Sequence, residues 1–100
     1  EKKWVKFSRQ LGDSKLNLPY LITQITPVDI VIVEGFKDSD HTKVEVVDSS
    51  SERKPLYETD RTICGLIINQ QKIQNAGLPQ FERDDVKKIC DFIEEKIGII

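Results

Sequence analysis

The sequence predicts an α/β fold, a mostly parallel sheet with flanking helices. Two segments, 29–34 ("DIVIVE") and 62–69 ("TICGLIIN"), are apolar on both faces, as strands of a buried parallel sheet are. An amphipathic helix pattern precedes the first segment, and another follows the second. Strands that alternate with such helices favour α/β packing.

The first half of the chain contains two of the predicted strands and one helix. "WVKFS" (4–8) predicts a short strand, and 29–34 predicts a central one. Between them, apolar residues recur at helical spacing after Asn17, a candidate N-cap, and Pro27 ends the pattern. These apolar residues are Leu18, Leu21, Ile22 and Ile25.

The second half predicts two more strands and a closing helix. "KVEVV" (43–47) is a strand with Glu45 on one face, and Gly65 within 62–69 indicates a closely packed neighbour. Asp84 is the predicted N-cap of the helix, and Gly98 its stop signal. The predicted apolar stripe of this helix consists of Val86, Ile89, Cys90, Ile93 and Ile97.

Composition excludes several classes of function. A formal charge of -2 argues against a dedicated nucleic-acid binder, and no apolar run is long enough for a membrane span. Cys64 and Cys90 are expected to be buried, reduced thiols, which indicates a cytoplasmic protein. His41 lies near Asp38 and Asp40 in what is expected to be a solvated loop rather than a metal site.

The hundred residues suffice for one domain at most. They contain no methionine and begin at Glu1, so we expect the downstream part of a longer polypeptide. Residues 1–100 are therefore either a single α/β domain or the C-terminal portion of a longer P-loop-type domain.

The end of segment 29–34 is the main candidate site. Glu34 stands at the carboxyl end of the strand, where open α/β sheets bind ligands. An acidic residue there can hold Mg²⁺, directly or through water, and Gly35 lets the backbone approach a phosphate. A simple exit from strand to loop explains the same two residues.

The chain lacks the phosphate-binding loop of a P-loop enzyme. None of its five glycines belongs to a G-x-x-x-x-G-K-[ST] motif. The chain is therefore not a self-sufficient P-loop NTPase, and we expect it to be inactive alone.

Four segments together resemble the C-terminal half of molybdopterin-guanine dinucleotide biosynthesis protein B (MobB). They are, in order, "DIVIVEGFKD", "TKVEVVD", "RTICGLIIN" and "LPQFERDDVKKICDFIEEKI". The resemblance begins near Leu16 and implies a three-layer, P-loop NTPase-like fold that here lacks its phosphate-loop strand. It also implies a cytoplasmic accessory protein of molybdenum cofactor assembly with weak GTPase activity, which binds GTP and Mg²⁺ and assists a molybdopterin guanylyltransferase-type enzyme.

The resemblance carries over to particular residues. Glu34 and Gly35 match the Walker-B-like end of the family, with Glu34 as the Mg²⁺-side carboxylate, and Phe36 and Lys37 complete its V-E-G-F-K motif. Lys37 lies near phosphate or is a solvated loop lysine. Relatives tend to carry aspartate where this chain has Asn69, which is either a base-side loop residue or a turn residue ending the strand.

A second hypothesis is a small, non-enzymatic α/β module that binds a protein partner. In the resembled fold, the phosphate-loop strand lies beside 29–34. Without it, an apolar strand edge would be unpaired and would favour a homo-oligomer.

Overall fold

The chain folds as two compact units, Glu1–Ser39 and Asp40–Ile100, and each is described by itself. A computed structural model describes residues 18–25, 27, 29–35, 37–48, 50, 52–69 and 71–98, together with the backbone of 4–8. The predicted N-cap Asn17 lies outside these residues.

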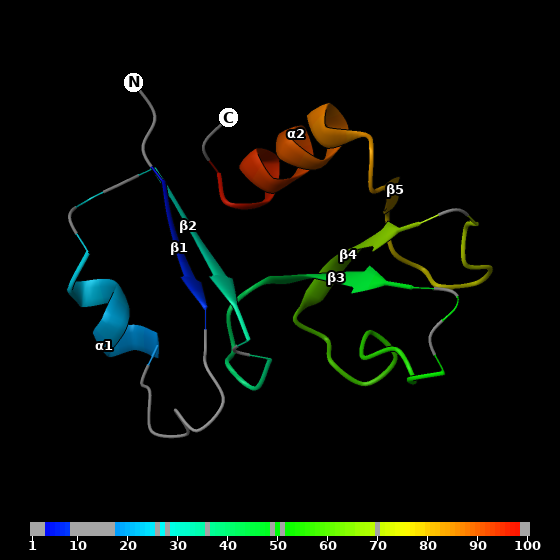
Figure 1. The fold of residues 1–100 in the computed structure, drawn as a ribbon, viewed down its shortest axis with the longest axis horizontal. Helices are drawn as coiled ribbons and strands as arrows, with labels where there is room; N and C mark the ends of the chain where they lie inside the picture. Colours follow the sequence, from blue (N-terminus) through cyan, green and yellow to red (C-terminus); the bar gives the residue numbers. More distant parts are fainter. Residues whose placement is uncertain are drawn as a thin grey trace. The chain divides into compact units, whose positions relative to one another are not determined.

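The first unit pairs two parallel strands, β1 (Trp4–Ser8) and β2 (Ile30–Glu34). Their register runs from Trp4 opposite Ile30 to Ser8 opposite Glu34, so both carboxyl ends lie at one edge. The helix α1 (Leu18–Thr23) lies between them in sequence, as Figure 1 shows. All three elements were predicted, and parallel strands need such a crossover.

The burial of β2 differs from the prediction. Ile32 keeps 43% of its surface exposed, while Ile30, Val31 and Val33 are half-buried. Within the described residues, β1 is the only strand that pairs with β2. A strand in a two-stranded sheet has too few neighbours to cover both of its faces, although its sequence is apolar enough for that. One edge of β2 is therefore paired with β1, and the predicted open edge stays a prediction.

The second unit contains a three-stranded parallel sheet and a helix. The strands are β3 (Lys43–Val47), β4 (Ile63–Ile68) and β5 (Gln80–Glu82), in the spatial order β3-β4-β5. The helix is α2 (Val86–Lys96). β3 and β4 were predicted, but β5 was not, because three residues are too few for a periodicity. Every strand pair in the described part is parallel, which confirms the α/β class.

The described parts of the connections within this sheet are irregular rather than helical. Residues 52–62 and 71–79 contain turns and bends but no helix, and Figure 1 shows them as loops beside the sheet. The main core lies between them and β4, where Ile63, Leu66 and Ile68 are 4%, 0% and 3% exposed. Six half-buried residues pack against this core: Val47, Leu56, Tyr57, Ile73, Ala76 and Leu78. Side chains of these loops therefore replace a covering helix.

The opposite face of β4 packs against α2. Successive strand residues point to opposite faces, so Gly65 faces away from Leu66. A Cβ added at Gly65 would lie 2.7 Å from Cε2 of Phe92 in α2, which confirms the predicted close packing. The ring of Phe92 also pairs with that of Phe81 in β5, with centroids 4.8 Å apart.

Two predictions about α2 were wrong in detail. Asp85, not Asp84, is the N-cap, because its side chain accepts the amide of Lys88 and its own amide donates to Glu82 in the preceding turn. The stripe is rotated: Val86 and Ile97 are 63% and 48% exposed, and Cys90 is exposed as well. Gly98 has a φ of 80° and fulfils its predicted role after the last turn.

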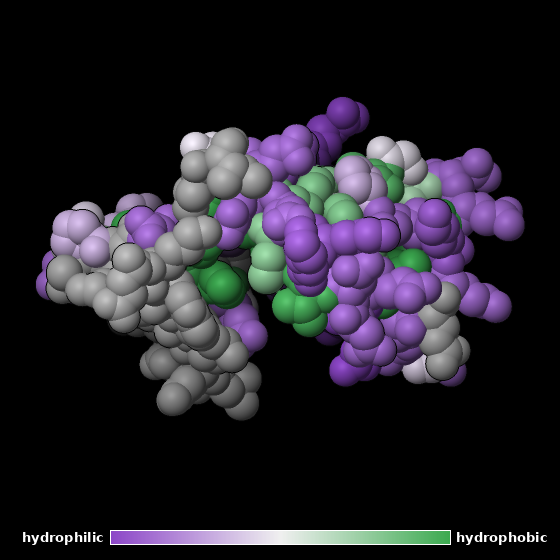
Figure 2. All heavy atoms as spheres, turned by 90° about the horizontal axis from the view of Figure 1, so that it is seen from above, coloured by the Kyte–Doolittle hydropathy of each residue, from purple (hydrophilic) through white to green (hydrophobic). Residues whose placement is uncertain are grey.

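The described residues on the face seen in Figure 2 are mainly hydrophilic. Figure 2 shows polar side chains over most of the visible face of the described residues, with smaller apolar patches between them. The longest described helix, α2, has 11 residues, and no helix among the described residues is both long and apolar enough to cross a bilayer.

Candidate functional site

The first predicted site lies at the carboxyl edge of the β1–β2 pair. Glu34 is the last residue of β2, and its side chain is exposed. It stands opposite Ser8, the last residue of β1, in the parallel register. The β-branched run of β2 therefore delivers a carboxylate to the sheet edge where α/β proteins bind ligands.

The residue after Glu34 turns the chain sharply. Gly35 has a φ of 82°, a backbone conformation that residues other than glycine rarely adopt. Lys37 follows two residues later in a turn and is exposed. Phe36 lies outside the described residues. The approach of a phosphate to Gly35 and the ligands of Glu34 and Lys37 stay predictions.

The arrangement suits a metal that takes one protein ligand. Mg²⁺ commonly binds through one or two carboxylates and completes its shell with phosphate oxygens and water. Glu34 could take this role, because it is an exposed carboxylate and is followed by a glycine with a positive φ. Within the described residues, no group of three or more His, Cys, Asp or Glu side chains forms a ready metal site.

A second polar edge lies at the carboxyl ends of the other sheet. Asn69 directly follows β4, and its Nδ2 donates a hydrogen bond to Oδ1 of Asp48, 3.0 Å away. Asp48 directly follows β3, and the same oxygen accepts the amide and the hydroxyl of Ser50 at 2.9 and 2.7 Å. Asn69 belongs to the second unit, whereas Glu34, Gly35 and Lys37 belong to the first.

This setting keeps Asp48 ionised. The hydrogen bonds from Ser50 are the main cause that lowers the pKa of Asp48, and those from Asn69 and the charge of Arg83 act in the same direction. Arg83 follows β5, and its amide donates to Ile68 at the end of β4. An exposed, ionised carboxylate here can accept hydrogen bonds from an N–H-bearing ligand such as a base.

Sequence reasoning missed Asp48 and Arg83. The available signal was positional: Asp48, Asn69 and Arg83 each come directly after a strand of one parallel sheet, so their backbones meet at one edge. Arg83 was missed because the strand β5 before it was not predicted. Asp48 was missed because it resembled the first residue of the polar loop after β3. The parallel pairing of β3, β4 and β5 shows that all three residues lie at the carboxyl edge of one sheet.

The pocket beside this edge is small. It has a volume of about 70 Å³. Its lining consists of Glu45, Val46, Val47, Asp48, Arg53, Lys54 and Pro55. A few water molecules fit in this space, but a nucleotide needs several hundred Å³. It is therefore not itself a nucleotide pocket.

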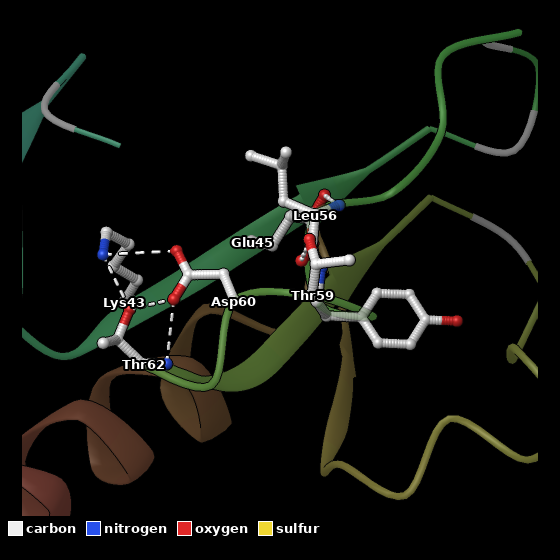
Figure 3. A network of polar contacts seen from close by, with 7 residues as sticks. Lys43, Glu45, Leu56, Thr59, Asp60 and Thr62 are labelled. Carbon is white, nitrogen blue, oxygen red and sulfur yellow. Dashed lines mark hydrogen bonds and ion pairs between the residues drawn. The ribbon is translucent and has the colours of Figure 1, made fainter. Parts of the chain in front are cut away.

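A network of polar contacts orders the beginning of the second sheet (Figure 3). Nζ of Lys43 lies 3.3 Å from Oδ2 of Asp60 and donates to Oγ1 of Thr62 at 2.6 Å. Oδ1 of Asp60 accepts the amide of Thr62 at 2.9 Å. These contacts join the start of β3 to the turn before β4.

Glu45 has a structural role in the same region. Its two carboxylate oxygens each accept a backbone amide at 2.8 Å, one from Leu56 and one from Tyr57. The amides of Thr59 and Asp60 both donate to the carbonyl of Leu56, which forms a helical turn. Glu45 thus caps the exposed amides at the start of that turn.

The environment of His41 differs from the prediction. Its ring is half-buried rather than solvated, and Nδ1 is enclosed without a hydrogen-bond partner among the described residues. Asp38 and Asp40 are exposed and form no metal group with it in the part of the chain that the structure describes.

Comparison with known proteins identifies the family. The model of the family described as "Molybdopterin guanine dinucleotide synthesis protein B" (MobB) matches residues 1–69. This range contains Glu34 and Asn69 and begins before Leu16, where the resemblance noted in the sequence begins. It ends before β5 and α2. No curated protein and no solved structure matches the chain. The match spans more than half of the chain, which therefore belongs to the molybdopterin guanine dinucleotide synthesis protein B family.

Proposed function

We propose that this chain contributes the metal-side half of a GTP·Mg²⁺ site in molybdopterin guanine dinucleotide synthesis. The observation that carries the proposal is Glu34 at the carboxyl edge of two parallel strands, followed by Gly35 with its positive φ. Membership of the family supports the same role.

In this role, Glu34 holds Mg²⁺ directly or through its water, and the ion neutralises the phosphates of the nucleotide. Gly35 leaves room for a phosphate, and Lys37 is near enough along the chain to face one. The sequence contains no G-x-x-x-x-G-K-[ST] motif, so another segment or polypeptide supplies the phosphate loop. We expect the chain alone to bind GTP weakly and not to hydrolyse it.

The edge formed by Asp48 and Asn69 lies in the second unit, and we propose it separately as an edge that binds a base. A guanine base presents N–H donors, and the Asp48 carboxylate is an ionised acceptor held in place by Asn69 and Ser50. In the cell, we propose that the protein serves a molybdopterin guanylyltransferase-type enzyme in the cytoplasm.

A paramagnetic NMR experiment tests the metal site in a weak complex. Mn²⁺ replaces Mg²⁺ and is added with GTP to the ¹⁵N-labelled chain. We expect selective broadening of the amide signals of Gly35 and Lys37, which the variant Glu34→Gln loses. The matched control Glu52→Gln removes an exposed loop carboxylate of the second unit and should leave the broadening unchanged. Broadening that is absent, or that persists in Glu34→Gln, would refute the role of Glu34.

The competing hypothesis is an interaction module without a nucleotide. Exposed apolar side chains favour it, since Tyr20 in α1 and Val46 in β3 are 62% and 71% exposed. Light scattering over a range of concentrations tests the related expectation of a homo-oligomer. If the chain self-associates and its amide signals do not change on addition of Mn²⁺ and GTP, the nucleotide proposal is refuted and the interaction module takes its place.

A further inference from the structure

His41 is the only histidine of the chain, and its side chain is enclosed in an unusual way. The ring is half-buried, and Nδ1 makes no hydrogen bond to any described residue. A neutral ring tolerates this, because it carries its proton on Nε2 and leaves only a lone pair on Nδ1. A protonated ring would place an N–H donor where it finds no acceptor, which costs free energy.

The charges around His41 add to this cost. Lys43 from β3 and Asp60 from the turn before β4 are the charged groups that act on it. The side chain of Lys43 is only 12% exposed, so its charge is poorly screened by water. Asp60, which contacts Lys43 and Thr62, acts in the opposite direction but less strongly than burial and Lys43.

We propose that His41 is a pH-sensitive latch. The neutral ring holds residues 40–42 against the starts of β3 and β4, and a proton on Nδ1 releases them. The proposal does not depend on nucleotide binding. It concerns the first residues of the second unit, which begins at Asp40.

The direction of the pH effect follows from the structure. Burial is the main cause that lowers the pKa of His41 below its ordinary value of 6.5, the charge of Lys43 lowers it further, and Asp60 opposes both. In the closed form residues 40–42 are held in place, and in the open form they are released and His41 is solvated. The closed form therefore binds the proton less well than the open form. Closure is unaffected above pH 6.5 and weakens as the pH falls through the lowered pKa.

Residues 40–42 lead directly into β3. The backbone provides a direct reporter at the far end of this segment. The amide of Lys43 donates to the carbonyl of Thr62 at 2.9 Å, and release of residues 40–42 exposes it. The amide of Leu66 donates to Pro79 within the core of the same unit and serves as an internal control.

NMR of the full chain tests the latch between pH 5 and 7.5. We expect the single histidine ring to titrate with a midpoint below 6.5. We expect the exchange protection of the Lys43 amide to fall between pH 6.5 and that midpoint, by about tenfold for each pH unit between them, and to level off below the midpoint. Protection of the Leu66 amide should not change.

Variants separate the latch from general acid unfolding. His41→Gln keeps a neutral polar side chain and should abolish the pH dependence at Lys43. Asp60→Asn removes an attractive charge and should lower the histidine midpoint further. A wild-type midpoint at or above 6.5, equal loss of protection at Leu66, or pH dependence that survives in His41→Gln would overturn the proposal. The wild-type titration decides even if a variant does not fold.

Discussion

The contact between Gly65 and Phe92 yields the sharpest prediction of the structure. Substitution Gly65→Ala adds one methyl group to the face of β4 that α2 covers. That carbon would lie 2.7 and 2.9 Å from Cε2 and Cζ of Phe92. Carbon atoms prefer separations of about 3.5–4.0 Å, so the ring must retreat by roughly 1 Å.

The retreat disturbs a cluster of contacts. Phe92 stacks at a 45° tilt on Phe81, and Nζ of Lys96 lies 5.5 Å from its ring centroid. Overpacking of this kind costs about 1–3 kcal/mol. Alanine also restricts the unfolded chain, which offsets about 0.4–1 kcal/mol. We therefore expect a net loss of about 1–2 kcal/mol, which lowers the melting temperature by about 4–8 °C for each kcal/mol.

A double-mutant cycle identifies the cause. Phe92→Leu shortens the side chain and removes Cε2 and Cζ, so Gly65→Ala should become nearly neutral in that background. Urea and thermal unfolding, followed by far-UV circular dichroism, measure the four free energies of unfolding. The coupling free energy between the two positions should be about 1–2 kcal/mol.

Gly77 offers a matched control with different physics. A Cβ added there meets no atom within 4 Å, but its φ of 74° strains any alanine. Gly77→Ala should therefore destabilise the protein equally with and without Phe92. The reasoning is refuted if Gly65→Ala costs the same in both backgrounds, or if it stabilises the wild-type chain.

The remaining predictions concern two carboxylates. Glu45→Gln exchanges the charged acceptor of the Leu56 and Tyr57 amides for one neutral oxygen and one NH₂ group, so we expect a loss of about 1–3 kcal/mol, measured by urea unfolding. Unchanged stability would show that water replaces these bonds. Asp85→Ala removes the N-cap of α2 and should cost about 1 kcal/mol, with faster amide exchange in the first helical turn, whereas Asp84→Ala should have no such effect. Equal effects of the two aspartate substitutions would contradict the assigned cap.

Local sequence patterns were sufficient for most of the secondary structure. Strands with β-branched runs such as "IVIV" and "KVEVV" were found close to their observed bounds, because such residues favour extended backbone whatever surrounds them. The stop signal at Gly98 was also recognised, since a residue that ends a helix often has a positive φ.

The candidate site was predictable only in part. The position of Glu34 at the end of an apolar strand follows from the sequence, and the observed parallel register places it at the expected edge. Asp48 was missed because its role depends on Asn69, 21 residues away, and on the pairing of β3 with β4. Contacts across strands leave no local trace in the chain.

The sequence by itself determined the α/β class, the family and the short-range signals for strands, helix α2 and glycine turns. These depend on residue types and spacings within a few positions, which act on the backbone directly. Only the tertiary structure decided the strand β5, the cap at Asp85, the enclosed ring of His41 and the loop-covered core around Leu66. Each of these depends on which distant segments pack together, and that choice follows from the free energy of the whole unit rather than from any local stretch.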